Sequence, residues 1–316
     1  MDKLFLLYGA LCFWVACSPI SYHPTPGSGI ELFVLGVAQD GGYPHAGCRR
    51  DCCRKYWSGK QPERTPACLA LVEQASGRVW LFEATPAYTR QWQRLREAAN
   101  LPDKAVPDGI FLTHAHMGHY TGHMNLGREA LGARAVPVYA LPRMKTYLET
   151  NGPWSQLVQL NNIELRGLVR DSAVTLAPGI RVTPFTVPHR DEFSETAGYR
   201  IEAGGKQIVF IPDIDKWERW ERDIVQEINT VDLAFLDATF YKNGELARDM
   251  REIPHPFIEE SMRLFDALPA VEKAKVRFIH FNHTNPMLWD AKERRAVEQR
   301  GFGVAREGER VMLEKK

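Results

Sequence analysis

The chain has 316 residues, 44% of them hydrophobic, and a formal net charge of +1 at pH 7. This length suits one large globular domain or two small ones. The lack of a basic excess argues against nucleic acid as a partner. At the N-terminus, Lys3 precedes an apolar run over 4–16, which is too short to span a bilayer comfortably and is typical of a signal peptide. We predict a signal peptide over 1–17, a Pro- and Gly-containing tether over 18–29, and a folded domain over 30–316.

Cys17 ends the apolar run after a small residue, as the lipidated cysteine of a bacterial lipoprotein signal does. Trp14 stands where such signals usually have leucine, and Asp2 dilutes the positive start. We therefore expect an exported protein, either periplasmic or attached to a membrane through a lipidated Cys17. A helix that belongs to the fold is the alternative for this segment.

The mature chain alternates between strand and helix patterns. Apolar runs bounded by turn residues predict early strands over 31–37, 67–72, 78–82, 109–112 and 136–140. Helices are predicted over 86–98, 121–131 and 142–149. In the second half, strands over 180–187, 198–202, 207–211, 233–236, 276–280 and near 311 are interleaved with helices over 216–228, 256–268 and 290–300. This mixture predicts two packed sheets covered by helices.

Three histidines, His114, His116 and His119, follow the apolar run 109–112 directly. Alternate residues of an extended segment point the same way, so His114 and His116 can face one point, and His119 can reach it as the chain turns into a helix. Neutral imidazoles that converge in a cleft suit zinc or iron. A solvated loop rich in histidine is the alternative.

Further candidate ligands follow later predicted strands. His189 comes after 182–187, Asp213 after 208–211, and His283 after 278–281. A lone residue of this kind is often a cap or a surface group. The ordered series indicates that these side chains complete one metal site at a common edge of the sheets.

This series resembles the metallo-β-lactamase superfamily, whose pattern is His-x-His-x-Asp-His followed by a distant His, an Asp and a final His. The resemblance covers nearly all of 31–313 and implies an αββα four-layer sandwich, of the α/β (α+β) class, with a metal site along one edge. The implied ligands are His114, His116 and His189 for a first ion, and His119 and His283 for a second, with Asp213 bridging the two. Asp215 is the fallback for Asp213.

Gly118 departs from this pattern, because the family has a metal-binding aspartate at that position. Glycine offers no ligand, so we expect a complete first site and a weaker or empty second site. The resemblance implies zinc, as one or two ions, with iron or manganese as alternatives.

Within the superfamily, the chain resembles coenzyme PQQ biosynthesis protein B and its relatives. The resemblance rests on the stretch 278–286 and on 39–44, which is followed by cysteines. Those proteins lack the two leading histidines of the motif and work in the cytoplasm, so we expect an exported relative rather than the pathway enzyme.

Asp237 begins the sequence Asp-Ala-Thr, which resembles a segment of tRNase Z and related phosphodiesterases. In that family the carboxylate supports a histidine on a later loop, and His255 stands where this histidine is expected. The resemblance implies a carboxylate–imidazole pair that protonates a leaving oxygen. The alternative is that Asp237 caps a turn and His255 is a loop residue.

A cysteine cluster lies before the second predicted strand. Cys48, Cys52 and Cys53, with His45 nearby, predict a structural zinc site, as the related biosynthesis protein has. A disulfide is the alternative, because an exported protein can oxidise these thiols.

We predict a metallohydrolase in which a metal-activated water attacks an ester, phosphodiester or amide bond of a small molecule. In this mechanism Asp213 takes the proton of the water, the metal stabilises the developing oxyanion, and His255 serves the leaving group. The alternatives are an iron-dependent oxygenase or PQQ-related protein, and a non-catalytic protein that binds a metal or a ligand.

Overall fold

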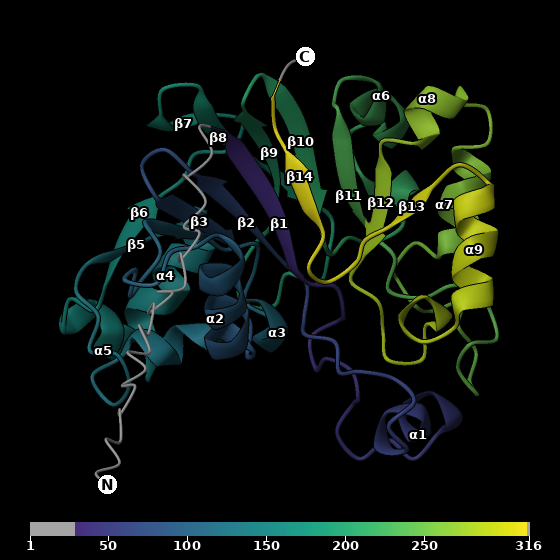
Figure 1. Ribbon diagram of the computed structural model, residues 1–316, viewed down its shortest axis with the longest axis horizontal. Coiled ribbons are helices and arrows are strands. Elements are labelled where there is room, and N and C mark those ends of the chain that lie inside the picture. Colours follow the sequence, from purple (N-terminus) through teal and green to yellow (C-terminus); the bar gives the residue numbers. More distant parts are fainter. Residues whose placement is uncertain (1–28, 315–316) are drawn as a thin grey trace, which may run out of the picture.

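The computed structural model describes residues 29–314 and arranges their strands in two sheets of seven strands each (Figure 1). The first sheet contains, from edge to edge, β14 (Arg310–Met312), β1 (Ile30–Gly36), β2 (Cys68–Glu73), β3 (Arg78–Phe82), β4 (Gly109–Phe111), β5 (Val136–Ala140) and β6 (Ile163–Gly167). The second contains β13 (Gly303–Val304), β12 (Val276–Ile279), β11 (Leu233–Asp237), β10 (Lys206–Ile211), β9 (Thr196–Ala203), β8 (Ile180–Val187) and β7 (Val174–Ala177). The predicted signal peptide, Cys17 and all of the tether except Gly29 lie outside the described residues.

The inner strands are apolar on both faces because each face meets a different layer. In β1, Leu32 and Val34 pack into the core between the two sheets, whereas Phe33 and Leu35 pack into a second core beneath the helices. Successive side chains of a strand point to opposite faces, so a strand between two apolar layers needs an uninterrupted apolar run. This requirement explains the continuous runs in the sequence.

Helices cover the outer face of each sheet (Figure 1). The first sheet is covered by α2 (Tyr88–Ala98), α4 (Pro142–Thr150) and α5 (Trp154–Gln159), and the second by α6 (Ile224–Asn229), α7 (Ile258–Leu264), α8 (Ala270–Lys273) and α9 (Ala291–Gln299). In α2, the buried residues Tyr88, Trp92 and Leu95 recur at helical spacing and face the sheet. The predicted four-layer αββα sandwich is confirmed.

Several elements differ from the sequence prediction. The helix predicted over 121–131 is a short α3 (Met117–Tyr120) continued by the 3₁₀ helix η1 (Thr121–Leu126), and that over 216–228 is split into η2 (Trp217–Arg219) and α6. The strands β6 and β7 were not predicted, because each lies at a sheet edge and carries polar, partly exposed residues that break the apolar pattern. Two further short helices, α1 (Asp51–Trp57) and η3 (Pro286–Leu288), lie in connections.

Among residues 29–314, no helix combines the length and the apolarity needed to cross a membrane.

Candidate metal centre

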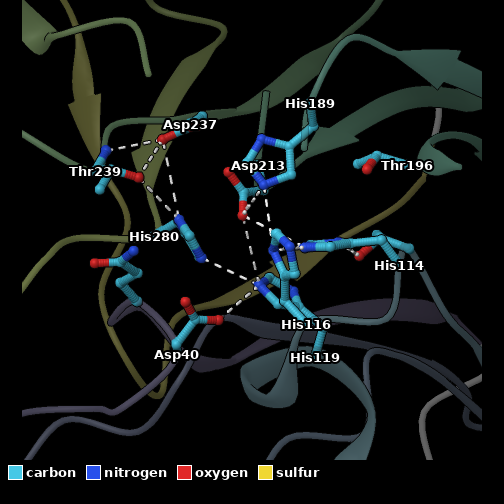
Figure 2. A network of polar contacts seen from close by, with 12 residues as sticks. Asp40, His114, His116, His119, His189, Thr196, Asp213, Asp237, Thr239 and His280 are labelled. Carbon is cyan, nitrogen blue, oxygen red and sulfur yellow. Dashed lines mark hydrogen bonds and ion pairs between the residues drawn. The ribbon is translucent and has the colours of Figure 1, made fainter. Parts of the chain in front are cut away.

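The candidate residues gather where strands of common direction end. In the first sheet, β1, β3 and β4 share one direction, since β2 is antiparallel to both β1 and β3 and β4 is parallel to β3. In the second, β8, β10, β11 and β12 share a direction for similar reasons. The carboxyl ends of such strands meet at one edge. The residues at or just after these ends are Asp40, His114, His189, Asp213, Asp237 and His280 (Figure 2). Glu83 follows β3 at the same edge.

The histidine motif is shaped by a change from extended chain to helix. His116 is extended, with φ −88° and ψ 142°, and forms the N-cap of α3. The preceding extended segment brings His114 and His116 to one point, with 2.8 Å between His114 Nε2 and His116 Nδ1. The first turn of α3 then carries His119 to the neighbouring position, and its backbone N–H donates to the His116 carbonyl.

The first group of ligand atoms comes from His114, His116, His189 and Asp213. His189 Nε2 lies 3.3 Å from His116 Nδ1 and 3.2 Å from Asp213 Oδ2, and Asp213 Oδ2 lies 3.6 Å from His114 Nε2. A tetrahedral zinc ion with bonds of about 2.0–2.1 Å holds its ligand atoms roughly 3.3 Å apart. These residues therefore fit a tetrahedral zinc ion.

The second group comes from Asp40, His119 and His280. His119 Nε2 lies 3.2 Å from Asp40 Oδ1 and 3.3 Å from His280 Nε2. It also lies 3.8 Å from Asp213 Oδ2, the atom that belongs to the first group. Figure 2 shows the Asp213 carboxylate between the two groups. From this position the Asp213 carboxylate could contribute a ligand atom to an ion held by either group.

Burial and the neighbouring carboxylates have opposite effects on the pKa values of the imidazoles. Burial lowers the pKa of His114 well below its usual value, which favours the neutral ring that a metal ligand requires. Burial also lowers the pKa of His189, but the Asp213 carboxylate outweighs it and raises that pKa to about 9. Burial raises the pKa of Asp40, but the adjacent His119 outweighs it and holds that pKa at about 2. The carboxylates thus stay ionised and attract positive charge to this edge.

Glu83 orients two of the imidazoles, and sequence reasoning missed it. It follows β3, is fully buried, and has φ 92°. Its Oε1 accepts the Thr113 hydroxyl at 2.5 Å and lies 3.2 Å from His119 Nδ1, and Thr113 Oγ1 lies 2.9 Å from His114 Nδ1. Both rings therefore direct Nε2 toward the ligand groups. The available signal was its position directly after a strand.

Thr239 and Asp237 orient His280 in the same manner. The Thr239 hydroxyl lies 3.0 Å from His280 Nδ1 and donates to Asp237 Oδ1 at 2.7 Å (Figure 2). His280 has φ 69° and directly follows β12. Positive φ is uncommon for a residue with a side chain, and here it accompanies a ring that points into the centre.

The predicted pair of Asp237 and His255 is formed in the structure. His255 Nδ1 lies 2.9 Å from Asp237 Oδ2 and 3.1 Å from Asp213 Oδ1. Burial lowers the pKa of His255, but the Asp237 and Asp213 carboxylates raise it to about 10. His255 thus lies beside the shared carboxylate as a charged proton donor. The fallback Asp215 lies instead behind His189, with 3.4 Å between its Oδ1 and His189 Nδ1.

His283, predicted as a ligand of the second ion, belongs to a different group in the structure. The chain turns at His280, so His280 faces His119, and His283 faces the cysteines. The two histidines are three residues apart after one strand, and the sequence alone does not show which of them points into the centre. The prediction for His283 is corrected to His280.

The cysteine cluster consists of Cys48, Cys52 and Cys53 together with His283. Its Sγ atoms lie 3.9 Å apart for Cys48 and Cys52 and 4.0 Å apart for Cys52 and Cys53, and these cysteines are free thiols. Ligand atoms of a tetrahedral zinc ion with Zn–S bonds of about 2.3 Å lie roughly 3.8 Å apart. The arrangement therefore fits a structural zinc site of three cysteines and one histidine.

His45, predicted as the histidine of this cluster, is not in the ligand group. Its ring stacks on that of His283, with 4.4 Å between centroids, and its Nδ1 faces the Ala46 carbonyl at 3.1 Å. The choice between His45 and His283 depends on a contact between distant parts of the chain, which spacing in the sequence does not reveal.

Comparison with known proteins identifies the family of this chain. A family model described as a beta-lactamase superfamily domain matches residues 78–281. The chain belongs to this superfamily. Coenzyme PQQ synthesis protein B from Methylobacterium sp. (strain 4-46) is 27% identical to it over 304 residues, which cover 88% of this chain and 98% of the relative.

Solved structures share the superfamily fold. Zinc-bound PqqB from Methylobacterium extorquens superposes with a TM-score of 0.74 at 24% identity, covering 89% of this chain and 99% of that one. A diphosphatase of the PhnP family gives 0.63 at 23% identity, over 90% and 96% of the two chains. The short form of human tRNase Z gives 0.57 at 14% identity, over 90% and 100%. The predicted resemblance to the superfamily and to PqqB-like proteins is confirmed.

Replacing Glu83 by glutamine is expected to lower the affinity for the second ion by about 10–100-fold, which is the usual effect of losing a residue that hydrogen-bonds to a metal ligand. The neutral amide loses the negative charge that strengthens the hydrogen bonds of Glu83 Oε1 with Thr113 and His119, so the orientation of His119 is held less firmly. Competition with a chromophoric chelator measures the affinity. Glu218→Gln, which alters an exposed carboxylate, is the control, and equal affinities in both variants would contradict the role of Glu83.

Proposed function

We propose that the chain is a metal-dependent hydrolase that acts on a small-molecule ester, with a phosphodiester as the preferred class. The observation that carries the proposal is the pair of ligand groups that share Asp213 Oδ2, with the Asp237–His255 pair beside them. A bound divalent ion would polarise the substrate and lower the pKa of a water molecule from about 15.7 toward 7.

The residues have distinct roles in this proposal. His114, His116 and His189 hold the first ion, and Asp213 contacts both positions. His255 donates a proton to the leaving oxygen, and Asp237 fixes its tautomer through Nδ1. The phosphodiester class is supported by this Asp–His pair together with folds shared with a PhnP-family diphosphatase and tRNase Z.

Zinc is the metal we propose. The superposed PqqB structure is a zinc-bound one, and the ligand set of three imidazoles and a carboxylate suits zinc. Iron in the purified protein, with oxygen consumption in place of hydrolysis, would favour the oxygenase alternative.

The test is turnover by protein purified without added metal. We expect about one or two zinc ions at the centre in addition to the cysteine site, and hydrolysis of bis(p-nitrophenyl) phosphate that a chelator abolishes and zinc restores. A lactone and a β-lactam complete the panel. Metal-loaded protein that turns over none of these substrates would contradict the hydrolase proposal and favour a binding protein.

We also propose export, with attachment to a membrane through lipidated Cys17, on the basis of the apolar run over 4–16. The mass of the mature N-terminus, with Cys17→Ser as the comparison, tests this proposal; an unprocessed Met1 would contradict it.

A further inference from the structure

Asp40 fills the space that a side chain at position 118 would need. A Cβ built on Gly118 would lie 2.2 Å from Asp40 Oδ1, 2.3 Å from its Cα and 2.8 Å from its Cβ. Contacts this short do not occur, so the loop after β1 and a side chain at 118 exclude each other. The absence of a side chain at Gly118 is thus matched to the presence of Asp40.

The Asp40 carboxylate is also aimed at the second ligand group. Its Oδ1 lies 3.2 Å from His119 Nε2, and it shares a ligand cluster with His119 and His280 (Figure 2). Among the described residues, Asp40 Oδ1 is one of the buried atoms that receive no hydrogen bond. A buried carboxylate oxygen costs free energy unless a partner compensates it. Asp40 Oδ1 and His119 Nε2 lie 3.2 Å apart without a hydrogen bond, a separation that suits two ligands of one ion.

We propose that Asp40 is the carboxylate ligand of the second metal position, and that it replaces the aspartate which Gly118 cannot provide. The ligand thus comes from the loop after β1 in place of the helix after β4. With His119, His280 and the shared Asp213, it gives the second ion two nitrogen and two oxygen donors. The second site, expected from the sequence to be impaired, is complete.

This inference rests on the proposed metal centre but does not require hydrolysis. It concerns which side chain binds the second ion, so a count of bound metal decides it even if no substrate is ever turned over. Failure of the hydrolase proposal would leave the metal count unchanged.

The first experiment compares the Asp40→Asn variant with the unaltered chain. The control is Asp103→Asn, which alters an exposed carboxylate in another loop. We expect bound zinc to fall from about three ions per chain to about two in Asp40→Asn only, since two ions bind at the centre and one at the cysteines. In cobalt-substituted protein, thiolate-to-cobalt absorption reports the cysteine site separately, and it should not change.

A second variant tests the same inference without altering any ligand. Gly118→Ala places a methyl group against Asp40 and should displace the carboxylate, with loss of the same ion. Gly167→Ala is the control, because a Cβ there meets only Lys145 Cδ at 3.6 Å. Circular dichroism verifies that each variant is folded. The inference is overturned if folded Asp40→Asn holds the second ion as tightly as the unaltered chain, or if the unaltered chain holds a single ion at the centre.

Discussion

Replacing His116 by alanine is expected to remove the first ion and to reduce turnover to the uncatalysed background. His116 Nδ1 lies within 3.3 Å of both His114 Nε2 and His189 Nε2, so it forms a corner of the ligand group. Without it, two nitrogens and the shared carboxylate remain. Metal analysis and the rate of phosphodiester hydrolysis measure the two losses in one preparation.

The matched variant is His255→Ala, which alters an imidazole of the same site without removing a member of the first two ligand groups. We expect it to retain both ions and to lose about 10²–10⁴-fold in kcat, the usual contribution of general acid–base catalysis. The loss should be large for an alkyl phosphodiester, whose leaving oxygen needs a proton, and small for a p-nitrophenyl ester, whose leaving group does not.

His255 contacts Asp213 as well as Asp237, which gives the experiment a second outcome. If His255→Ala loses metal together with activity, the ring holds the shared carboxylate in place and is a positioning residue. If His116→Ala retains both metal and turnover, the ligand assignment itself is contradicted.

The parts of the fold that could be predicted from the sequence are those in which local pattern and burial agree. The inner strands are apolar on both faces, and the histidines 114 and 116 follow one of them at a spacing of two residues. Local geometry alone brings this pair together. The edge strands β6 and β7 lack such a pattern and could not be predicted, since most of their residues are partly or fully exposed.

The residues that the sequence did not identify are joined to the site by contacts between distant segments. Asp40 precedes the histidine motif by more than seventy residues and meets it because β1 and β4 end at one edge. The choice of His280 over His283 depends on a single backbone turn with positive φ. Neither feature is encoded in a short motif. The glycine at 118, where the family has aspartate, is visible in the sequence. Its spatial neighbour Asp40 cannot be recognised there.

The cysteine cluster and the second ligand group share two segments of chain. Asp40 and Cys48 lie on the connection between β1 and α1, and His280 and His283 lie on the segment after β12. The segments are joined by hydrogen bonds from Gln39 N to the Phe281 carbonyl at 2.8 Å and from the Asn282 amide to Gln39 Oε1 at 2.7 Å. A zinc ion at the cysteines would therefore hold in place the two loops that carry Asp40 and His280.

Replacing His283 by alanine is accordingly expected to remove the zinc at the cysteines. It should also lower the affinity for the second ion at the centre by about 10–100-fold, as the loss of interactions that position a metal ligand does. The first ion, which is held by residues of other segments, should remain. Total zinc, chelator competition and the thiolate-to-cobalt absorption together separate the three positions.

His45→Ala is the decisive control, because His45 stacks on His283 at 4.4 Å but contributes no ligand atom to the cluster. It should retain the thiolate-to-cobalt absorption that His283→Ala loses. If His283 were instead a ligand of the catalytic centre, His283→Ala would leave that absorption unchanged and remove only the second ion. If His45 held the structural zinc, the effects of the two variants would be exchanged. The pair of variants therefore assigns each imidazole to one site, because each assignment changes a different combination of metal count and absorption.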